Sequence, residues 1–352
     1  MSRVTIREVA HEAGVSVSTV SNWLNDRNDA LSESTADVIR EVVERLGYRP
    51  SSFARGMRGV STKALGLIVP SVAHPSFAAI IHGAEERAQE SNYSLFISSI
   101  DRRWDRILEA TKVMLDHRVD GIGYVYTIEE ADHEAAQAAR DAGAQVALVL
   151  PIGDRPFKGA VTLDNGAAMR QVASHLWNLG HRDYAIVMNP LSTANGRHRV
   201  EAITAALQDM GRGEQPNIRV VSPHVSSSMY EELNEIGMGQ RAGFELWTAS
   251  PSPTAVVAVT DTLAVGVVQA AHDLGIEIPR DASVVGFDDL PISLVCSPHV
   301  TTVAVPMREI GRSLVDLLIQ EDGEEREGPV VIPTLIVRDS TGPAPGSKVV
   351  KE

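Results

Sequence analysis

The stretch AGVSVSTVSNWLN, residues 13–25, is short, polar and regularly spaced. Hydroxyl or amide side chains stand at positions 16, 18, 19, 21, 22 and 25, around the apolar residues Val20 and Leu24. Because Val20 and Leu24 are four residues apart, a helix over residues 17–25 turns both to one side. The stretch therefore predicts a small helix that packs on one side and presents positions 17, 18, 21, 22 and 25 on the other.

Two further helices are expected around this one. Thr5 followed three residues later by Glu8 forms a capping box, which predicts a helix start. Gly14 permits the positive φ of a tight turn, and Ser16 is a good N-cap for the next helix. A third helix is expected to begin near position 32 and to end at the next glycine. Helix, glycine turn and helix form the plan of a helix-turn-helix domain, whose second helix enters the major groove of DNA.

The charge distribution is compatible with DNA although the chain is acidic. Net charge is −14, which on its face argues against a nucleic-acid partner. Residues 1–62 contain eight Arg and eight acidic residues, so this segment is neutral and the remainder carries the whole deficit. Five basic residues occur from Arg45 to Lys63, and no acidic residue stands between Glu44 and Glu85. Backbone N–H groups and short polar side chains bind phosphates without lysine, so a domain with no net charge can still bind DNA.

After Lys63, apolar runs alternate with amphipathic segments such as FAAIIHGAEERAQE, residues 77–90. The ten runs are ALGLIV, YSLFIS, GIGYVY, QVALVL, AVTL, YAIVM, IRVV, AVVAVT, SVVGF and TTVAV. Continuous apolar strands that alternate with helices imply parallel sheets covered on both faces. Ten strands are more than one open sheet of the mononucleotide-binding type contains, so two such sheets are expected. The expected fold class is therefore α/β: an N-terminal all-α helix-turn-helix domain, then two doubly wound parallel-sheet subdomains resembling periplasmic binding proteins.

Several classes of protein and site are not expected. No stretch reaches 18 uncharged apolar residues, so neither a transmembrane helix nor a membrane partner is predicted. MSRVTIREVA lacks the apolar run of a secretory signal, and the single cysteine, Cys296, forms no intrachain disulfide. Together these features predict a cytoplasmic protein. His74 and His224 have no second ligand at metal spacing, so no metal and no cofactor are expected.

Two rival functions were weighed against DNA binding. An enzyme is not expected, because no glycine-rich phosphate loop follows the first strand and no G-x-S-x-G elbow occurs. A transport protein that binds sugars has the same core, and only residues 1–62 argue against it. From spacing alone, the three-helix unit is as compatible with protein binding and a solvated polar face as with DNA.

Almost the whole chain resembles the lactose-repressor family (LacI/GalR). The resemblance rests on motifs that occur in this order: VTIREVAHEAGVSVSTVSNWLN, ESTADVIREVVERLGYRPSSFARGMR, RVDGIGYV, VTLDN, LWNLGHRDYAIV, PTAVVAVTDTLAVG, SVVGFDDLP and PHVTTVAVPMREIGR. It implies a homodimeric transcriptional regulator, favouring a repressor, that binds a pseudo-palindromic double-stranded operator. It also implies a small-molecule effector, a sugar or sugar derivative, in the cleft between the two core subdomains.

The resemblance assigns DNA contacts residue by residue. Val17, Ser18 and Asn22 match positions that read bases. Phosphate-contacting positions match Thr5, Ser16, Thr19, Ser21 and Asn25. Asn22 stands where Arg is frequent, and Asn binds adenine bidentately whereas Arg favours guanine.

Residues 51–62, SSFARGMRGVST, resemble the family's hinge helix, which folds on DNA. Met57 takes the place of the Leu that wedges into the minor groove, and Arg55 is expected near the backbone. Gly56 lowers intrinsic helicity by about 1 kcal/mol relative to Ala, so a helix of about eight residues is unstable alone. Without the resemblance, a plain flexible linker is the alternative.

Effector contacts are expected beyond the carboxyl ends of the strands, where open α/β sheets bind ligands. The resemblance assigns this role to Ser76, Phe77, Asp164, Arg199 and Asp288, with Thr260 standing where Asn is frequent. Carboxylates and a guanidinium bind polyol hydroxyls, and a sugar ring can rest on an aromatic face. For each Asp, capping of a helix or turn is the alternative, and Asp261 and Asp289 are assigned to capping.

The predicted domains are residues 1–50 for DNA binding, 51–62 for the hinge, 63–340 for the effector-binding core and 341–352 for a disordered tail. Within the core, the first subdomain is expected at about 63–162 and 292–322, and the second at about 163–291 and 323–340.

Overall fold

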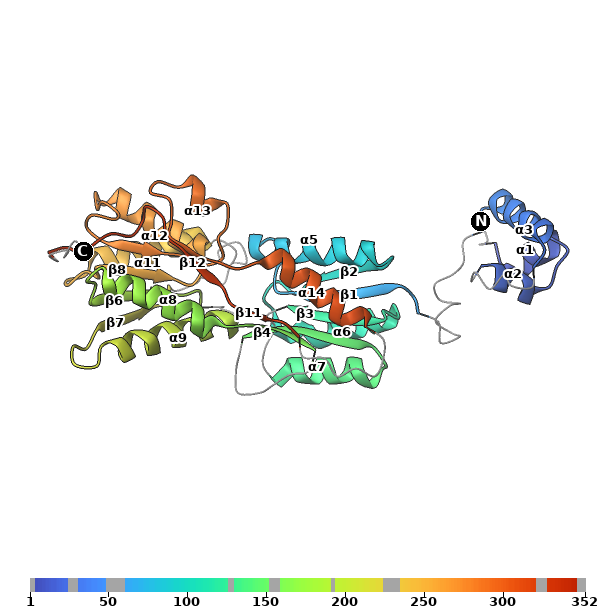
Figure 1. The fold of residues 1–352 in the computed structure, drawn as a ribbon, viewed down its shortest axis with the longest axis horizontal. Coiled ribbons are helices and arrows are strands. Elements are labelled where there is room, and N and C mark those ends of the chain that lie inside the picture. Colours follow the sequence, from blue (N-terminus) through green and yellow to red (C-terminus); the bar gives the residue numbers. More distant parts are fainter. Residues whose placement is uncertain are drawn as a thin grey trace. The chain divides into compact units, whose positions relative to one another are not determined.

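The computed structural model describes residues 4–24, 31–48, 61–125, 130–151, 159–190, 194–223, 235–320 and 328–346. Two compact units make up the chain, Met1–Thr62 and Lys63–Glu352 (Figure 1). No helix among the described residues is long and apolar enough to cross a membrane.

Three helices form the first unit: α1 (Ile6–Glu12), α2 (Val17–Trp23) and α3 (Glu33–Leu46). The predicted capping box is present, because the Thr5 side chain accepts from the Glu8 backbone and Glu8 accepts from the Thr5 backbone. Gly47 ends α3 in the left-handed region, with φ 60°. The three helices share one apolar core, built on Val9, Ala10, Val20, Ile39 and Val42.

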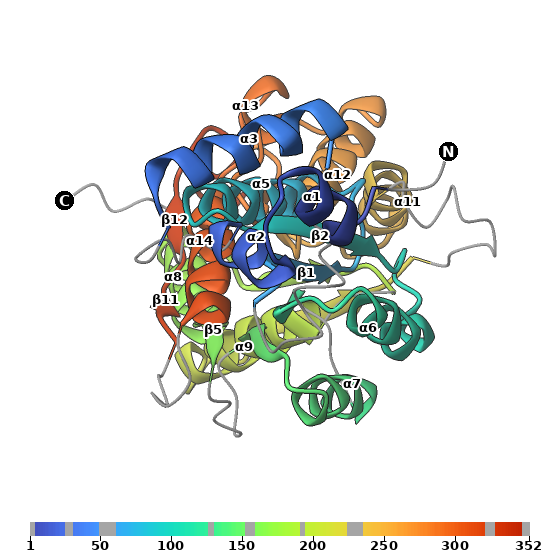
Figure 2. The same ribbon diagram turned by 90° about the vertical axis from the view of Figure 1, so that its right-hand side faces the viewer.

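A six-stranded parallel sheet forms the first subdomain of the second unit, in the order β11-β5-β4-β3-β1-β2. Its strands are β1 (Ala64–Val69), β2 (Ser94–Ser99), β3 (Gly121–Val125), β4 (Gln145–Pro151), β5 (Ala160–Leu163) and β11 (Val330–Val331). Its helices are α5 (Pro75–Glu90), α6 (Ile107–Asp116), α7 (Glu130–Asp141) and α14 (Met307–Ile319), with a short 3₁₀ turn at Trp104–Arg106. Alternate side chains of β1 enter two cores: Leu67 packs beneath α5 and α14, and Ile68 packs beneath α6 and α7. Helices therefore cover both faces of this sheet (Figure 2).

A four-stranded parallel sheet, in the order β7-β6-β8-β9, forms the second subdomain. Its strands are β6 (Asp183–Val187), β7 (Asn217–Val221), β8 (Ala255–Ala258) and β9 (Ser283–Val285). Its helices are α8 (Asn165–Asn178), α9 (Ala194–Met210), α11 (Glu235–Thr248), α12 (Asp261–Asp273) and α13 (Ile292–Val295). Two short strands, β10 (Thr302–Ala304) and β12 (Thr334–Ile336), pair antiparallel. Each of the ten predicted strands has a counterpart, and the predicted α/β class is confirmed.

The subdomain boundaries differ from the prediction in two places. β11 was expected in the second subdomain, but it pairs with β5 and so completes the first sheet. α13 was expected in the first subdomain, but its contacts are with α12. Both differences arise because the chain crosses between the sheets again near its end, with β10 and β12 side by side. Parallel pairing of β11 requires the chain to return to the first sheet, which periodicity alone does not indicate.

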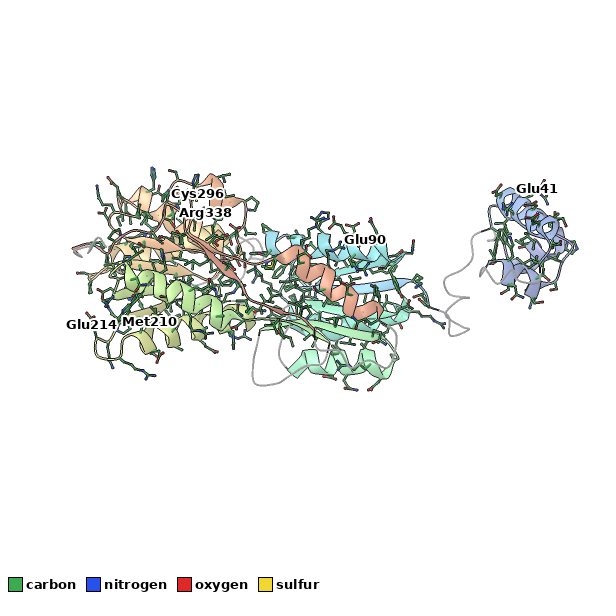
Figure 3. All side chains as sticks on the ribbon, viewed as in Figure 1. Glu41, Glu90, Met210, Glu214, Cys296 and Arg338 are labelled. Carbon is green, nitrogen blue, oxygen red and sulfur yellow. The ribbon has the colours of Figure 1, made fainter. Side chains whose placement is uncertain are left out.

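In the first subdomain, α5 and α14 approach each other to backbone contact. A Cβ atom on Gly83 would lie 2.0 Å from the carbonyl oxygen of Arg308, and one on Gly311 would lie 2.0 Å from that of Ile80. Ion pairs flank the contact: Glu86 with Arg308 at 2.5 Å, Glu90 with Arg312 at 2.7 Å and Arg87 with Asp316 at 2.6 Å (Glu90 in Figure 3). Glycine is required at both positions because any side chain would force the helices apart.

The beginning of the predicted disordered tail is ordered. The Gly342 backbone donates to Ser283 Oγ at 3.0 Å, and the Ala344 backbone donates to the Leu179 carbonyl at 2.8 Å. Residues 341–346 therefore belong to the second subdomain, and 347–352 lie outside the described residues.

His181 anchors this segment. Its Nε2 lies 3.0 Å from the Gly342 carbonyl, so Nε2 carries the proton, and 2.9 Å from Ser283 Oγ. Its Nδ1 lies 3.0 Å from Thr254 Oγ1, and the side chain is fully buried. Burial lowers the pKa of His181 to about 4, although the Gly342 carbonyl acts in the opposite direction.

This pKa predicts acid sensitivity of the fold. The unfolded chain keeps a pKa near 6.5, so between pH 6.5 and 4 it binds a proton that the folded protein does not. The contribution to the free energy of unfolding is complete above pH 6.5, and about 2 kcal/mol of it is lost by pH 5. Urea unfolding at pH 7 and pH 5 measures this loss. His181→Gln should reduce it, whereas His272→Gln, at an exposed position, should not; equal losses in both variants would contradict the assignment.

Candidate functional site

The exposed face of α2 is polar, as predicted for a recognition helix. Ser18 and Asn22, one turn apart, are exposed, and Val17 is 37% exposed at the start of the helix. Val20 is fully buried, and Leu24 packs against the same core. A rigid three-helix support therefore presents two hydrogen-bonding side chains and one small apolar side chain together.

The predicted phosphate contacts have different environments. The Ser16 hydroxyl caps α2 by accepting from Thr19 N at 3.1 Å, and the Thr5 hydroxyl donates to Glu8 at 2.9 Å. Ser21 is only 9% exposed, so its expected place on the polar face is wrong. Ser21 stands beside the buried Val20 and three residues before Leu24, which packs on the same core, so it turns toward the core. Asn25, Arg55 and Met57 lie outside the described residues.

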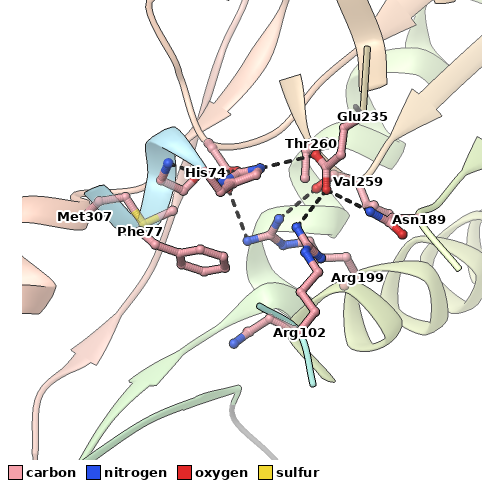
Figure 4. Close-up of a pocket in the computed structure, with 13 residues that line it drawn as sticks. His74, Phe77, Arg102, Asn189, Arg199, Glu235, Val259, Thr260 and Met307 are labelled. Atoms are coloured by element: carbon pink, nitrogen blue, oxygen red, sulfur yellow. Dashed lines mark hydrogen bonds and ion pairs between the residues drawn. The ribbon is translucent and has the colours of Figure 1, made fainter. Parts of the chain in front are cut away.

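A pocket lies between the two subdomains of the second unit. Its walls come from the starts of α5, α9, α11, α12 and α14 and from the ends of strands of both sheets. The lining residues are His74, Ser76, Phe77, Arg102, Asn189, Asn195, Gly196, Arg199, Glu235, Val259, Thr260, Asp288 and Met307 (Figure 4). About 450 Å³ of space between protein atoms, open solvent included, lies among these residues.

Five of the six predicted effector contacts line this pocket: Ser76, Phe77, Arg199, Thr260 and Asp288. The sixth, Asp164, is not among the lining residues. Its carboxylate accepts from Ala167 N at 2.7 Å and caps α8, which is the capping alternative weighed for it. The predicted roles of all six in ligand binding stay predictions.

Arg199 and Asp288 form a buried pair on one wall. Arg199 is 5% exposed; its guanidinium stacks 3.5 Å from the Phe287 ring centroid, and its Nη1 donates to the Val259 carbonyl at 2.7 Å. Its Nη2 lies 3.3 Å from Asp288 Oδ1, while Asp288 Oδ2 accepts from Ser76 Oγ at 2.7 Å. Burial raises the pKa of Asp288, and the charge of Arg199 opposes that rise.

Three buried polar atoms in this wall lack a hydrogen-bond partner among the described residues. They are Nε of Arg199, Oδ1 of Asp288 and Nδ2 of Asn195. Two are donors and one is an acceptor, and all three residues line the pocket. Because buried polar groups in proteins are nearly always paired, this wall is suited to a ligand that both donates and accepts hydrogen bonds.

Glu235 dominates the opposite wall. Its Oε1 accepts from Arg102 Nη2 and Asn189 Nδ2, each at 3.0 Å. Around Oε2 lie His74 Nε2 at 3.2 Å, Thr260 Oγ1 at 2.9 Å and Thr262 Oγ1 at 2.5 Å. Burial alone would raise the pKa of Glu235, but the hydrogen bond and charge of His74, the charge of Arg102 and the Thr262 hydroxyl together lower it.

Five polar residues of the pocket were not predicted to contact an effector. Asn189, Asn195, Arg102 and Glu235 were given no role, and His74 was expected to be an ordinary loop residue. His74 caps α5, since its Nδ1 accepts from Ser76 N at 3.3 Å, while Nε2 faces Glu235. The one available signal was position: His74 and Arg102 closely follow the first two strands, at the sheet edge where ligands bind.

Asp261 was assigned to capping of a helix or turn. The residue that caps α12 is Thr260, whose side chain accepts from Leu263 N at 3.3 Å. The buried Asp261 carboxylate accepts from Leu290 N at 2.7 Å and Thr302 Oγ1 at 2.5 Å. Asp261 thereby ties α12 to β10, where the chain crosses toward the first subdomain. Burial raises its pKa to about 8.

Similarity to known proteins decides the family. Residues 5–51 match bacterial regulatory proteins of the lacI family, and residues 173–341 match a periplasmic binding protein-like domain. Catabolite control protein A of Priestia megaterium is 30% identical over 323 residues, covering 92% of this chain and 93% of that protein. The chain belongs to the LacI family.

Other LacI-family proteins align over nearly the full length. The HTH-type transcriptional repressor PurR of Pasteurella multocida is 29% identical, covering 96% of this chain and 98% of PurR. A crystal structure of the lac repressor dimer bound to operator and the anti-inducer ONPF has a TM-score of 0.81 at 25% identity, covering 97% and 100% of the two chains. As a LacI-family member, the protein is a DNA-binding transcriptional regulator and not an enzyme. Regulators of this family bind operator DNA and small-molecule effectors.

Proposed function

We propose that this LacI-family protein is a transcriptional repressor whose operator affinity is controlled by a sugar or sugar derivative bound in the pocket. The observation that carries the proposal is the wall in which Arg199 Nε and Asp288 Oδ1 are buried without a hydrogen-bond partner among the described residues. A sugar hydroxyl both donates and accepts, so neighbouring hydroxyls satisfy a guanidinium and a carboxylate together. Phe77 offers a ring for the apolar face of the sugar.

A repressor is favoured because the PurR relatives carry that name, and the lac repressor structure includes operator and anti-inducer. Two helix-turn-helix units read a pseudo-palindrome when two protomers pair. Exposed apolar side chains support pairing of the cores: Phe96 and Ile97 on the edge strand β2 are 45% and 44% exposed, and Val295 on α13 is 80% exposed. Since operators are chromosomal, we place the protein in the cytoplasm.

Two measurements test this function. A gel shift against DNA upstream of the gene, repeated at rising salt, is expected to show a salt-sensitive complex with a dyad-related site. A thermal-shift screen of sugars is expected to identify a ligand that raises the melting temperature, because binding to the folded state stabilises it. A protein that binds no dyad-related site, with or without these sugars, would refute the repressor function. Stabilisation by other metabolites and by no sugar would refute the sugar assignment alone.

Asn22 provides a specific test of DNA reading. We expect Asn22→Ala to lose discrimination at one operator base pair, by about 1–3 kcal/mol, because a bidentate amide contact to adenine disappears. Selection from a randomised site library measures this. Ser34→Ala is a suitable control, since Ser34 lies on α3 and is also exposed. Unchanged base preference in Asn22→Ala would exclude the proposed contact.

A further inference from the structure

An ion pair and a histidine contact from the first subdomain meet on one buried carboxylate of the second. Glu235 belongs to the second subdomain and is 4% exposed, at the start of α11. Two of its partners, His74 and Arg102, come from the first subdomain; the other three come from the second. Figure 4 shows His74 and Arg102 reaching it from different elements.

The five contacts leave Glu235 little capacity for a ligand. A carboxylate accepts about four hydrogen bonds, and five donor side chains already surround this one. A hydroxyl group that approached Glu235 would have to displace one of them. The carboxylate is therefore placed to connect protein to protein. Asp288 also joins the subdomains, through Ser76 Oγ at 2.7 Å, but its Oδ1 has no hydrogen-bond partner among the described residues.

We propose that Glu235 is a clamp that holds the two subdomains together before an effector binds. Its partners in the other subdomain are Arg102 and His74. The proposal rests on the proposed function only in taking the pocket as the effector site. Opening the cleft separates Arg102 from Glu235, and a buried charge that loses its partner must be rehydrated. Glu235 thus sets the ratio of closed to open molecules. Effector affinity depends on the fraction of protein in the binding-competent state, so the clamp also sets that affinity.

The test measures closure directly and needs no effector. Cys296 is the only cysteine in the sequence, so Cys296→Ser provides a background for labelling. Glu134→Cys on α7 and Gln208→Cys on α9, both at exposed positions of different subdomains, then carry spin labels. Labelled full-length chain is mixed with excess unlabelled chain, so that distances within one protomer dominate. Pulsed electron-spin resonance gives the distribution of distances in the ligand-free protein.

Three variants are compared in this background. Glu235→Gln keeps the size of the side chain and removes its charge. Arg102→Met removes the guanidinium that pairs with Glu235 from the other subdomain. Glu86→Gln is the matched control: the same substitution in an ion pair, with Arg308 at 2.5 Å, that lies within one subdomain. Thermal unfolding of each variant checks that it is folded, and Arg102→Met serves alone if Glu235→Gln does not fold.

We expect one predominant distance in the unmodified chain. In Glu235→Gln and in Arg102→Met, the closed-to-open ratio should fall about tenfold or more, and the double variant should add little to either. Glu86→Gln should keep the original distribution. Ratios within twofold of the unmodified chain in both clamp variants would overturn the proposal, as would an equal change in Glu86→Gln. Since no effector enters the measurement, either result leaves the proposed function standing.

Discussion

Arg199→Met should raise the effector concentration needed to change operator affinity by about tenfold or more, while the protein still binds its operator. The substitution keeps the aliphatic bulk over Phe287 but removes the guanidinium whose Nε is unpartnered among the described residues. It also leaves Asp288 buried without its cationic neighbour. A hydrogen bond to a charged group contributes about 1.5–3 kcal/mol, so loss of the proposed contact from Arg199 to the effector should lower effector affinity about tenfold or more.

Fluorescence anisotropy of a labelled operator measures this, with titration of the sugar that gives the largest thermal shift. Arg182→Met is the matched control, because Arg182 also stacks on an aromatic ring, 3.6 Å from the Trp177 centroid, and also pairs with a carboxylate, Glu214 at 3.0 Å. Arg182 does not line the pocket. The prediction fails if Arg199→Met responds at the same sugar concentration as the unmodified protein.

Gly83→Ala should lower the free energy of unfolding by more than about 3 kcal/mol, at the upper end of overpacking substitutions. Its methyl group would lie 2.0 Å from the Arg308 carbonyl oxygen, and backbone cannot move aside as a side chain can. Separating α5 from α14 would also lengthen the ion pairs of Glu86 and Glu90 with α14. The expected fall in melting temperature is about 6 °C or more.

Gly166→Ala is the appropriate comparison, because Gly166 is also helical, but a Cβ there meets only the ends of side chains, 3.2 Å from Asp164 Oδ1 and 3.3 Å from Arg170 Nη1. Ala is favoured over Gly in helices by about 1 kcal/mol, so this variant should be unchanged or slightly more stable. Calorimetry or chemical unfolding distinguishes the two. If Gly83→Ala and Gly166→Ala melt together, backbone contact between α5 and α14 does not limit stability.

Much of the fold could be predicted because its signals are local. Capping at Thr5, Ser16 and Gly47 depends on residues within one helical turn, and the long apolar runs identify most strands. β11 and β12 were missed because Pro329 and Pro333 interrupt the apolar residues around them, whereas the equally short β9 and β10 lie in uninterrupted runs. The first residues of the C-terminal segment were misjudged from composition, since Ala344 is only 8% exposed.

The candidate site could be predicted only where a residue matches a position that contacts ligand in the family. Ser76, Phe77, Arg199, Thr260 and Asp288 were assigned in this way, and they line one pocket. Glu235 was not, because its role depends on Arg102 and His74, which are 133 and 161 positions away. No periodicity or spacing connects such positions; only the meeting of two subdomains brings them together. Ser21 was placed on the exposed face of α2 because helical spacing does not define a sharp boundary between the buried and exposed faces of a short helix.

The return of β11 and α14 to the first sheet has a consequence for synthesis. The third helix of the first unit ends at Leu46, so this unit can fold soon after it leaves the ribosome. The first subdomain of the second unit cannot complete its fold until later, because a strand and a covering helix of its sheet come from residues 307–331. In a nascent or truncated chain that stops before this point, a folded helix-turn-helix unit is attached to an incomplete first subdomain. That subdomain is exposed to proteases until translation ends.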